Sequence, residues 1–151
     1  MYPFSYCTNL SSITVDKNNT VFDSRDNCNA IIEKATNKLV VGCKSTEIPS
    51  SVTCIGDRSF LGQGTLTSIT IPKSIKSIEG YAFYRCDGLN KVISQIEEPF
   101  DIEESVFSNY DTSTKTRFFT NATLYVPKGT KSIYLQAEGW KEFKKIVETE
   151  E

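Results

Sequence analysis

Apolar and polar positions recur along the chain with a spacing of 23 residues. Residues 48–70, IPSSVTCIGDRSFLGQGTLTSIT, are followed directly by residues 71–93, IPKSIKSIEGYAFYRCDGLNKVI, and the two segments align without a gap. The positions that agree are mostly apolar, whereas the polar residues between them vary. The apolar matches are Ile48/Ile71, Pro49/Pro72, Ile55/Ile78, Phe60/Phe83 and Leu66/Leu89, with Val52/Ile75 and Ile69/Val92 as conservative replacements. A period in the twenties with apolar residues at constant phases is typical of a solenoid, in which stacked units share one core.

Weaker copies of the unit flank these two repeats. Residues 4–15 resemble the second half of the unit, and residues 122–127 resemble its strand and the proline that follows. Ile102 and Phe107 lie 24 residues after Ile78 and Phe83. The pattern therefore predicts a single domain, residues 1–151. Its parts are a partial repeat 1–15, a hairpin insert 16–47, full repeats 48–70 and 71–93, an irregular repeat 94–127 and a C-terminal cap 128–151.

Each unit combines a strand with a returning arc. Residues 66–71, LTSITI, have the L-x-x-L-x-L form of a leucine-rich-repeat strand. Alternation directs Ile69 and Ile71 inward and Ser68 and Thr70 outward. Pro72 ends the strand because it has no amide hydrogen to donate. The arc of residues 75–83 would return along the other side of the core. We therefore predict an α/β-type leucine-rich-repeat solenoid of strands and irregular coils, with about four parallel strands in one curved sheet.

The insert, residues 16–47, predicts a β-hairpin. Its strands are expected at residues 28–33 and 38–43, with a turn at residues 34–37. Pairing Glu33 with Lys38 places this charge pair on one face and an apolar set on the other, toward the core. The apolar set is Cys28, Ala30, Ile32, Leu39, Val41 and Cys43. Cys28 and Cys43 then lie opposite each other, which allows a disulfide, although burial as free, small apolar residues is the favoured interpretation.

The end of the chain predicts a cap. Residues 132–145, SIYLQAEGWKEFKK, indicate a short helix that is broken at Gly139. The last unit of a repeat array would expose its core without such a cover. The apolar residues expected to form it are Tyr134, Leu135, Trp140, Phe143 and Ile146.

The repeats resemble the BspA-like leucine-rich repeats of bacterial surface proteins. Those units read approximately I-P-x-x-V-x-x-I-x-x-x-A-F-x-x-C-x-x-L-x-x-I-x-I, and residues 71–93 match at nearly every specified position. The first full unit departs from this form, with Ser59 at the Ala position, Gln63 at the Cys position and a different turn at residues 62–64. The segment DSRDNCNAII and the ending VPKGT…GWKEF also resemble parts of this family, so the resemblance covers essentially the whole chain. It implies a secreted or surface-exposed protein, and the start inside a repeat predicts that a leader and earlier sequence precede Met1.

Composition and motifs argue against catalysis. The chain has 17 basic and 19 acidic residues, a net charge of −2, which does not favour binding to nucleic acid or to an acidic membrane. No apolar run approaches the ~20 residues that span a bilayer. The chain has no histidine, so it contains no Ser–His or Cys–His pair, and it has no phosphate-binding glycine loop. We predict no enzyme activity and no cofactor.

Acidic residues offer only weak candidates for a metal site. Those between residues 97 and 104 are expected in a solvated loop, with nothing apolar nearby to raise a carboxyl pKa. The run from Asp16 to Thr20 loosely resembles the start of a calcium loop but lacks the glycine and the closing glutamate of an EF-hand. The five cysteines form no CxxC motif. We therefore predict no metal site.

The outward strand positions are the remaining candidates for function. Aligning the units places Ser12, Ser68, Lys91 and Thr123 in one column, and Thr14, Thr70, Ile93 and Tyr125 in the next. Ser and Thr are also what an ordinary solvated strand carries, whereas an exposed aromatic and an aliphatic residue beside a cation are typical of an interaction hot spot. The predicted ligand-binding residues, on a concave sheet face, are Ser68, Thr70, Lys91, Ile93, Thr123 and Tyr125.

These observations lead to two functional hypotheses. The first is a non-catalytic module that mediates protein–protein interaction or adhesion; the resemblance implies an extracellular or host-surface partner, such as a matrix protein. The alternative is a spacer or stalk segment of a larger surface protein, without a ligand of its own. Carbohydrate binding on the sheet is less favoured, because only Tyr125 supplies an outward aromatic ring there.

Overall fold

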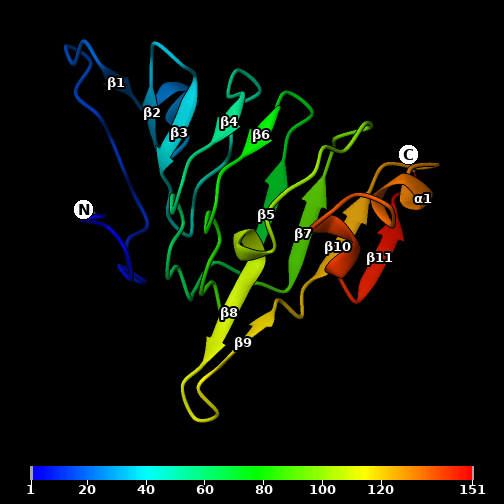
Figure 1. The fold of residues 1–151 in the computed structure, drawn as a ribbon. Helices are drawn as coiled ribbons and strands as arrows, with labels where there is room; N and C mark the ends of the chain where they lie inside the picture. The colour runs from blue at the N-terminus through cyan, green and yellow to red at the C-terminus, as the bar shows by residue number, and fades with distance from the viewer. Residues whose placement is uncertain (1, 151) are drawn as a thin grey trace.

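In the computed structural model, residues 2–150 are described, and successive coils of the chain lie side by side from the N-terminus to the C-terminus (Figure 1). Each full repeat contributes one strand to each of two sheets. The first repeat provides β4 (Cys54–Ile55) and β5 (Ser68–Ile71), and the second provides β6 (Ser77–Ile78) and β7 (Lys91–Ser94). The fold is thus a leucine-rich-repeat type built mostly of short strands.

One sheet has four strands, all parallel, in the order β11-β10-β7-β5. Strand β10 (Thr123–Val126) belongs to the irregular repeat, and β11 (Lys145–Glu148) follows the cap. Within β5, Ile69 and Ile71 are buried while Ser68 and Thr70 are exposed, as the alternation predicts. The sequence did not predict β11 as a strand.

The second sheet has five strands in the order β1-β2-β3-β4-β6. Strands β1 (Phe22–Asp23), β2 (Ile31–Glu33) and β3 (Lys38–Val41) are antiparallel, whereas β3, β4 and β6 are parallel. The parallel part arises because arcs of neighbouring repeats lie within hydrogen-bonding distance: Glu79 N donates to Ile55 O at 2.9 Å. The predicted single curved parallel sheet is therefore replaced by a parallel sheet and a separate mixed sheet.

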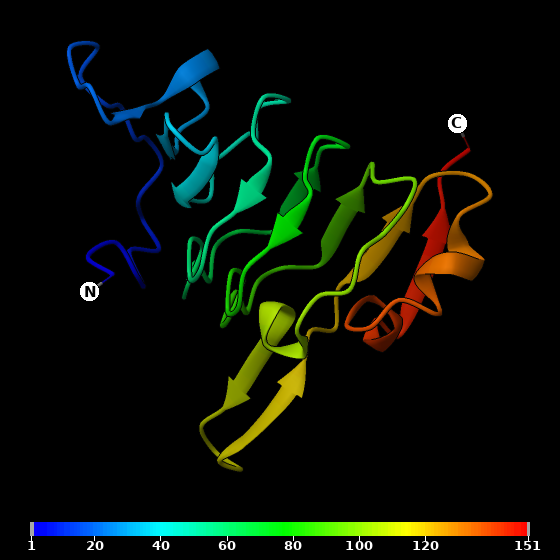
Figure 2. The same ribbon diagram turned by 45° about the horizontal axis from the view of Figure 1, so that its top comes forward.

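A third sheet, which has two strands, projects from the stack of coils. Strands β8 (Ser108–Asp111) and β9 (Thr116–Phe119) form an antiparallel hairpin, which extends away from the two sheets (Figure 2). It follows a short 3₁₀ helix, η2 (Glu104–Phe107). The sequence did not predict this hairpin, because residues 108–121 carry no repeat pattern.

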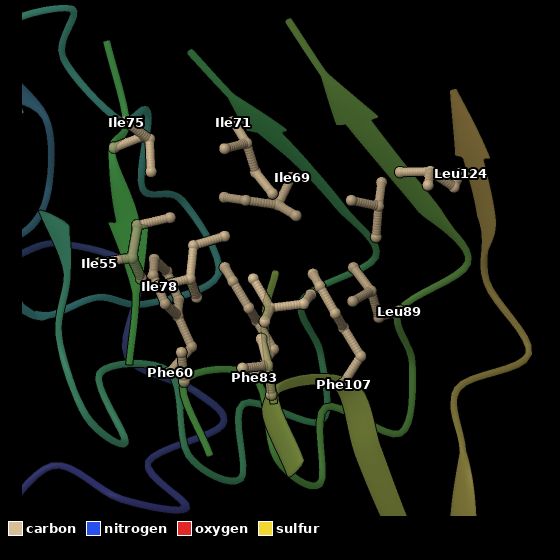
Figure 3. Close-up of a cluster of buried hydrophobic side chains, with 14 of the residues drawn as sticks. Ile55, Phe60, Ile69, Ile71, Ile75, Ile78, Phe83, Leu89, Phe107 and Leu124 are labelled. Atoms are coloured by element: carbon tan, nitrogen blue, oxygen red, sulfur yellow. The ribbon is translucent and has the colours of Figure 1, made fainter. Parts of the chain in front are cut away.

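The apolar positions shared by the repeats form the core. Phe60, Phe83 and Phe107 come from three successive coils and stack on one another, with ring centroids 4.8 and 5.1 Å apart (Figure 3). Each of these side chains is at most 1% exposed. Isoleucines and leucines of the same repeats pack around this stack, including Ile55, Ile78 and Leu89. The stack confirms that Phe107 has the same repeat phase as Phe83.

The insert forms the predicted hairpin with Glu33 opposite Lys38. A bulge between Ile31 and Ile32 shifts the register by one residue beyond this point. Lys38 does not pair with Glu33; its Nζ lies 2.6 Å from Glu79 Oε1, on the second repeat. Of the predicted apolar face, Val41 is only half-buried, and the other five members are buried.

Cys28 and Cys43 are both free thiols in the structure. The Sγ atom of Cys28 faces Ala30 O at 3.9 Å, and that of Cys43 faces Asn29 O at 3.4 Å. Both residues are buried, at 1% and 0% exposure. They therefore pack as small apolar residues, as favoured from the sequence.

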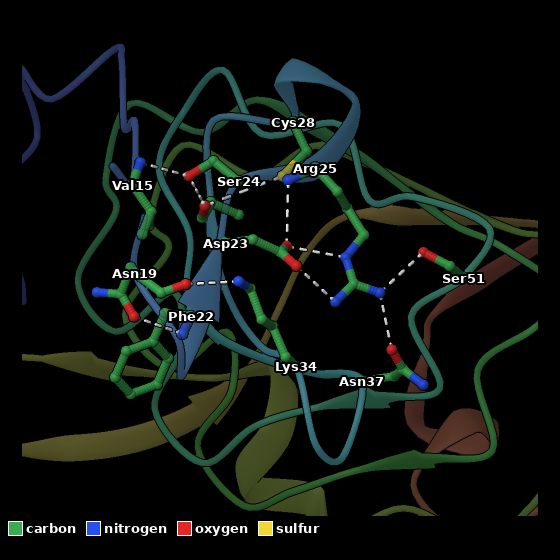
Figure 4. Close-up of polar contacts among 11 residues, drawn as sticks. Val15, Asn19, Phe22, Asp23, Ser24, Arg25, Cys28, Lys34, Asn37 and Ser51 are labelled. Atoms are coloured by element: carbon green, nitrogen blue, oxygen red, sulfur yellow. Dashed lines mark hydrogen bonds and ion pairs between the residues drawn. The ribbon is translucent and has the colours of Figure 1, made fainter. Parts of the chain in front are cut away.

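Arg25 connects the insert to the first full repeat (Figure 4). It lies in a 3₁₀ turn, η1 (Arg25–Asn27), and its Nε and Nη2 donate to the two carboxylate oxygens of Asp23 at 2.8 and 2.9 Å. Its Nη1 donates to Asn37 Oδ1 at 2.7 Å, in the hairpin turn, and faces Ser51 Oγ at 3.4 Å. This bidentate pair lowers the pKa of Asp23, chiefly through the side-chain hydrogen bonds from Arg25.

The C-terminal cap is a short helix, α1 (Lys131–Tyr134), then a turn and a 3₁₀ helix, η3 (Trp140–Glu142). The chain changes direction at Gly139, which has a φ of 78°. Four predicted cap residues are buried, but the prediction for Leu135 is wrong, because its side chain is 50% exposed. Ala137 is buried in its place at 8%, since it follows α1 by one further turn and faces the core. Met1 and Glu151, the ends of the predicted partial repeat and cap, lie outside the described residues.

The Cys86 thiol and the Tyr134 hydroxyl are buried acidic groups, and because of them we predict that the protein loses stability in alkaline solution. Burial raises the pKa of the Cys86 thiol from 9.0 to about 12, and that of the Tyr134 hydroxyl from 10.0 to about 12. A raised pKa means that the folded state holds the proton more tightly. The stability from each group is therefore complete below its unfolded pKa and is lost as the pH rises through the folded one. We expect the free energy of unfolding, measured with urea, to fall between about pH 9 and pH 12.

A variant separates the two contributions. Tyr134 Oη lies 2.6 Å from Ser94 Oγ and donates to Ile96 O at 2.7 Å. Tyr134→Phe removes the hydroxyl, so stability between pH 10 and 12 should fall less steeply than in the wild type, even though the variant is less stable at neutral pH. The same slope in both proteins would show that this hydroxyl titrates normally.

Candidate interaction surfaces

The sheet register aligns the predicted site residues into two columns on the outer face of the four-stranded sheet. Ser68, Lys91 and Thr123 are neighbours across β5, β7 and β10, and so are Thr70, Ile93 and Tyr125. The columns continue to Lys145 and Val147 on β11. The structure does not extend them to Ser12 and Thr14, because residues 10–15 form no strand and β5 is the edge strand among the described residues.

Three members of these columns form a contiguous patch, which we call the sheet patch: Lys91, Ile93 and Tyr125. The Nζ atom of Lys91 lies 5.0 Å from the centroid of the Tyr125 ring, within the range of a cation–π contact. Lys91 is exposed, whereas Ile93 and Tyr125 are half-buried. The patch thus offers a cation, an aromatic ring and an aliphatic side chain held together at fixed register.

Ser68 and Thr70 lie beside a hollow at the free edge of β5. They line a groove of about 460 Å³ together with Thr46, Glu47, Ile48, Ser50 and Gln95. Ile69 and Pro72 also contribute to its wall. The two hydroxylated residues therefore belong to a different surface feature from the sheet patch.

A second surface has no counterpart among the sequence predictions. It consists of arginine and tyrosine side chains from the N-terminal segment, from the turns that join the two sheets and from strand β9, and we call it the Arg–Tyr cluster. The guanidinium of Arg58 lies 5.2 and 4.6 Å from the rings of Tyr2 and Tyr81. The guanidinium of Arg117 lies 5.7 and 5.6 Å from the rings of Tyr81 and Tyr84, and that of Arg85 lies 5.6 Å from Tyr6.

Part of the Arg–Tyr cluster follows from the repeat, whereas Arg117 comes from strand β9 of the projecting hairpin, outside the repeat pattern. Arg58 and Tyr81 occupy the same repeat phase, and both have positive φ, 54° and 58°. Four residues later, Gly62 and Arg85 share a phase and again have positive φ, 70° and 58°. Each turn repeats the same backbone conformation, so side chains at these phases line up on neighbouring coils. The equal repeat phase of these positions can be read from the aligned sequences. It predicts the cluster only weakly, because the residue type at the polar positions differs from one unit to the next.

The acidic segments do not assemble a metal site within residues 2–150. No group of three or more His, Cys, Asp or Glu side chains is placed to hold a metal ion there. Asp16 Oδ1 instead accepts a hydrogen bond from Asn18 N at 2.8 Å, which is an Asx turn. Among the described residues, no helix is long and apolar enough to cross a membrane.

Comparison with known proteins identifies the repeat type. A family model, the BspA type leucine rich repeat region (6 copies), matches residues 31–126. The crystal structure of a leucine rich cell surface protein from Faecalibacterium prausnitzii A2-165 is similar, with a TM-score of 0.53 and 22% sequence identity over 99% of this chain. The similarity covers 44% of that protein, so this chain spans less than half of its length. No curated protein matches the chain. Because the family model covers more than half of the sequence, the chain belongs to the BspA-type leucine-rich-repeat family.

Proposed function

We propose that this protein is a non-catalytic interaction module of a bacterial cell surface, and that it attaches to an extracellular or host-surface protein. Family membership and the similarity to a cell surface protein support a surface role. The single observation that favours protein binding is the sheet patch. Its three residues come from two adjacent strands, and the register keeps them together without any contribution to the core.

Such a patch suits a protein partner for a physical reason. Strand backbones hold the three side chains at fixed spacing, so little conformational entropy is lost when a partner binds. Tyrosine combines a large contact area with a polar end, and aromatic residues are enriched in protein interfaces. The Ser and Thr residues around it would form a polar rim that needs no rearrangement.

A binding screen tests the proposal. The purified chain is immobilised and exposed to extracellular-matrix proteins and to a glycan array, and hits are measured by biolayer interferometry. For a protein hit, we expect the triple variant Lys91→Ala, Ile93→Ala, Tyr125→Ala to bind at least about 10-fold more weakly, as loss of a hot spot does. The matched control is the Arg–Tyr cluster double variant Arg117→Ala, Tyr84→Ala, which should bind as the wild type does.

Other outcomes would contradict the proposal. If the sheet-patch variant binds as the wild type does and the control variant loses binding, the binding site is the Arg–Tyr cluster. The absence of any protein hit in the screen would favour the alternative, a spacer segment within a longer surface protein. A thermal melt of each variant tests whether it is folded at the assay temperature, so that a loss of binding can be told apart from unfolding.

A further inference from the structure

A pocket of about 340 Å³ lies at the N-terminal end of the stack, far from the sheet patch in sequence. The N-terminal segment, residues 2–5, forms one wall, and β3 forms another. The floor is the turn of the first full repeat, residues 56–63. Its volume falls at the lower end of the range of about 300–1,000 Å³ that is typical of small-molecule sites.

Two buried oxygen atoms of the pocket lining have no hydrogen-bond partner among the described residues. They are Ser59 Oγ and Gln63 Oε1, on residues that are only 4% and 1% exposed. The amide nitrogen of Gln63 is satisfied, since Nε2 donates to Phe4 O at 3.3 Å. Leaving a buried polar atom without a hydrogen-bond partner destabilises the folded state. Both residues line the pocket, so its wall contains two acceptor atoms that have no partner within the described chain.

These two residues are also the two side chains that depart from the repeat. The following repeat has Ala82 and Cys86 at the same phases, buried at 0% and 1% exposure. An apolar pair therefore suffices for packing at these phases. In the first repeat, polar side chains stand in place of this apolar pair, and they do so in the turn that forms the floor of the pocket. Packing alone therefore does not account for Ser59 and Gln63.

The charges around the pocket are balanced. Lys38 Nζ lies 2.6 Å from Glu79 Oε1, and Arg58 Nη1 lies 2.7 Å from Asp57 Oδ2. Tyr2 Oη also donates to Asp57 at 2.5 Å. Each positively charged side chain of the lining is already paired with a carboxylate. A charged ligand would therefore find no unpaired side chain of opposite charge in the pocket. The lining therefore favours a neutral ligand.

The remaining lining is mostly apolar, with Ser5 as its further polar side chain. Tyr2 and Phe4 are 45% and 40% exposed, and Val41 and Leu61 are half-buried on neighbouring walls. A ligand that fits must combine an apolar face with hydroxyl or amide hydrogens. We propose that the pocket binds a neutral saccharide, whose hydroxyl groups donate to Ser59 Oγ and Gln63 Oε1 while its C–H face packs against Tyr2 and Phe4. This site is separate from the sheet patch and does not depend on it.

The test uses the wild-type chain, labelled with ¹⁵N, and three neutral disaccharides as probes: lactose, cellobiose and N,N′-diacetylchitobiose. Saturation-transfer NMR detects binding, and titration followed by ¹H–¹⁵N spectra locates it. We expect at least one probe to shift the Gln63 side-chain amide and the Gly62 amide in a saturable manner. Ser59→Ala and Gln63→Leu should each weaken that binding at least 10-fold.

A matched control comes from elsewhere in the chain. Ser74 Oγ is also buried without a partner in the described part of the chain, but Ser74 does not line the pocket. Ser74→Ala should therefore leave the saccharide titration unchanged. Each variant is checked by circular dichroism, and Ser59→Thr, which keeps a hydroxyl, should retain more binding than Ser59→Ala.

Three results would overturn the proposal. One is that no probe shows saturable binding, which would mean that water alone pairs with the two oxygens. Another is that the double variant Ser59→Ala, Gln63→Leu still binds the probe. The third is that a neutral blocked peptide, N-acetyl-glycyl-asparaginamide, binds in a manner sensitive to both variants while the disaccharides do not.

Discussion

Replacing Phe83 with alanine is expected to lower the free energy of unfolding by about 3–5 kcal/mol. Phe83 lies between Phe60 and Phe107, with centroid distances of 4.8 and 5.1 Å, and it is 1% exposed. Its removal takes a buried ring from the core and leaves both neighbouring rings without a stacking partner. The resulting cavity joins three coils, so relaxation of one coil cannot fill it. Urea unfolding followed by the fluorescence of Trp140, the single tryptophan, measures the loss.

Phe118 provides a matched control for this prediction. It lies on β9 in the projecting hairpin and is 38% exposed. Phe118→Ala should therefore change the free energy of unfolding by no more than about 0.5 kcal/mol, as is usual for a surface position. A loss below about 1 kcal/mol for Phe83→Ala would contradict the continuous aromatic stack, because even a partial cavity costs more than this.

Replacing Gly139 with alanine is expected to destabilise the cap by at least about 2 kcal/mol, because two costs combine. With a φ of 78° and a ψ of −50°, alanine at this position would occupy a sparsely populated backbone region, at a cost of about 1–3 kcal/mol. An added Cβ would also lie 2.3 Å from Ile102 O, a backbone atom that can move only with its coil, and overpacking adds about 1–3 kcal/mol. Because Trp140 follows directly, a shift of its fluorescence maximum under native conditions should accompany the loss.

Gly129 separates the two costs. Its φ of 82° is nearly the same, but among the described residues no heavy atom beyond its chain neighbours lies within 4 Å of the place that an added methyl group would take. Gly129→Ala should thus carry only the conformational cost, about 1–2 kcal/mol. Equal losses at Gly129 and Gly139 would mean that the cap does not pack tightly against the irregular repeat at Ile102.

The predictions from sequence that the structure confirms concern positions whose environment repeats. Ile55 and Ile78, or Phe60 and Phe83, meet the same neighbours in successive coils, so their apolar character alone identifies them as core. The outward columns of the four-stranded sheet follow for the same reason, since a constant period sets the register between strands. The hairpin was predictable because alternation and a four-residue turn are local signals, and Glu33 does lie opposite Lys38.

The errors concern residues whose surroundings come from distant parts of the chain. Leu135 is apolar and adjacent to the buried Tyr134, but a helix of four residues leaves its side chain on the solvent side. The hairpin register alone pairs Lys38 with Glu33, yet Glu79 lies closer once β3 and β6 enter the same sheet. Strand β11 has little local signal; it forms because the cap returns the chain to the free edge of β10.

The order of the amino acids is enough to predict the repeat, its core positions, the family resemblance and the columns on the parallel sheet. These depend on period and alternation, which a chain displays in one dimension. The contacts between coils, in contrast, determine that the strands of the repeats divide between two sheets, that arginines and tyrosines meet on one surface, and that Ser59 and Gln63 line a pocket beside residues 2–5. Those features depend on which coils lie next to each other. Burial, ion pairing and unsatisfied hydrogen bonds result from contacts between distant parts of the chain, and the type of a single residue does not determine them.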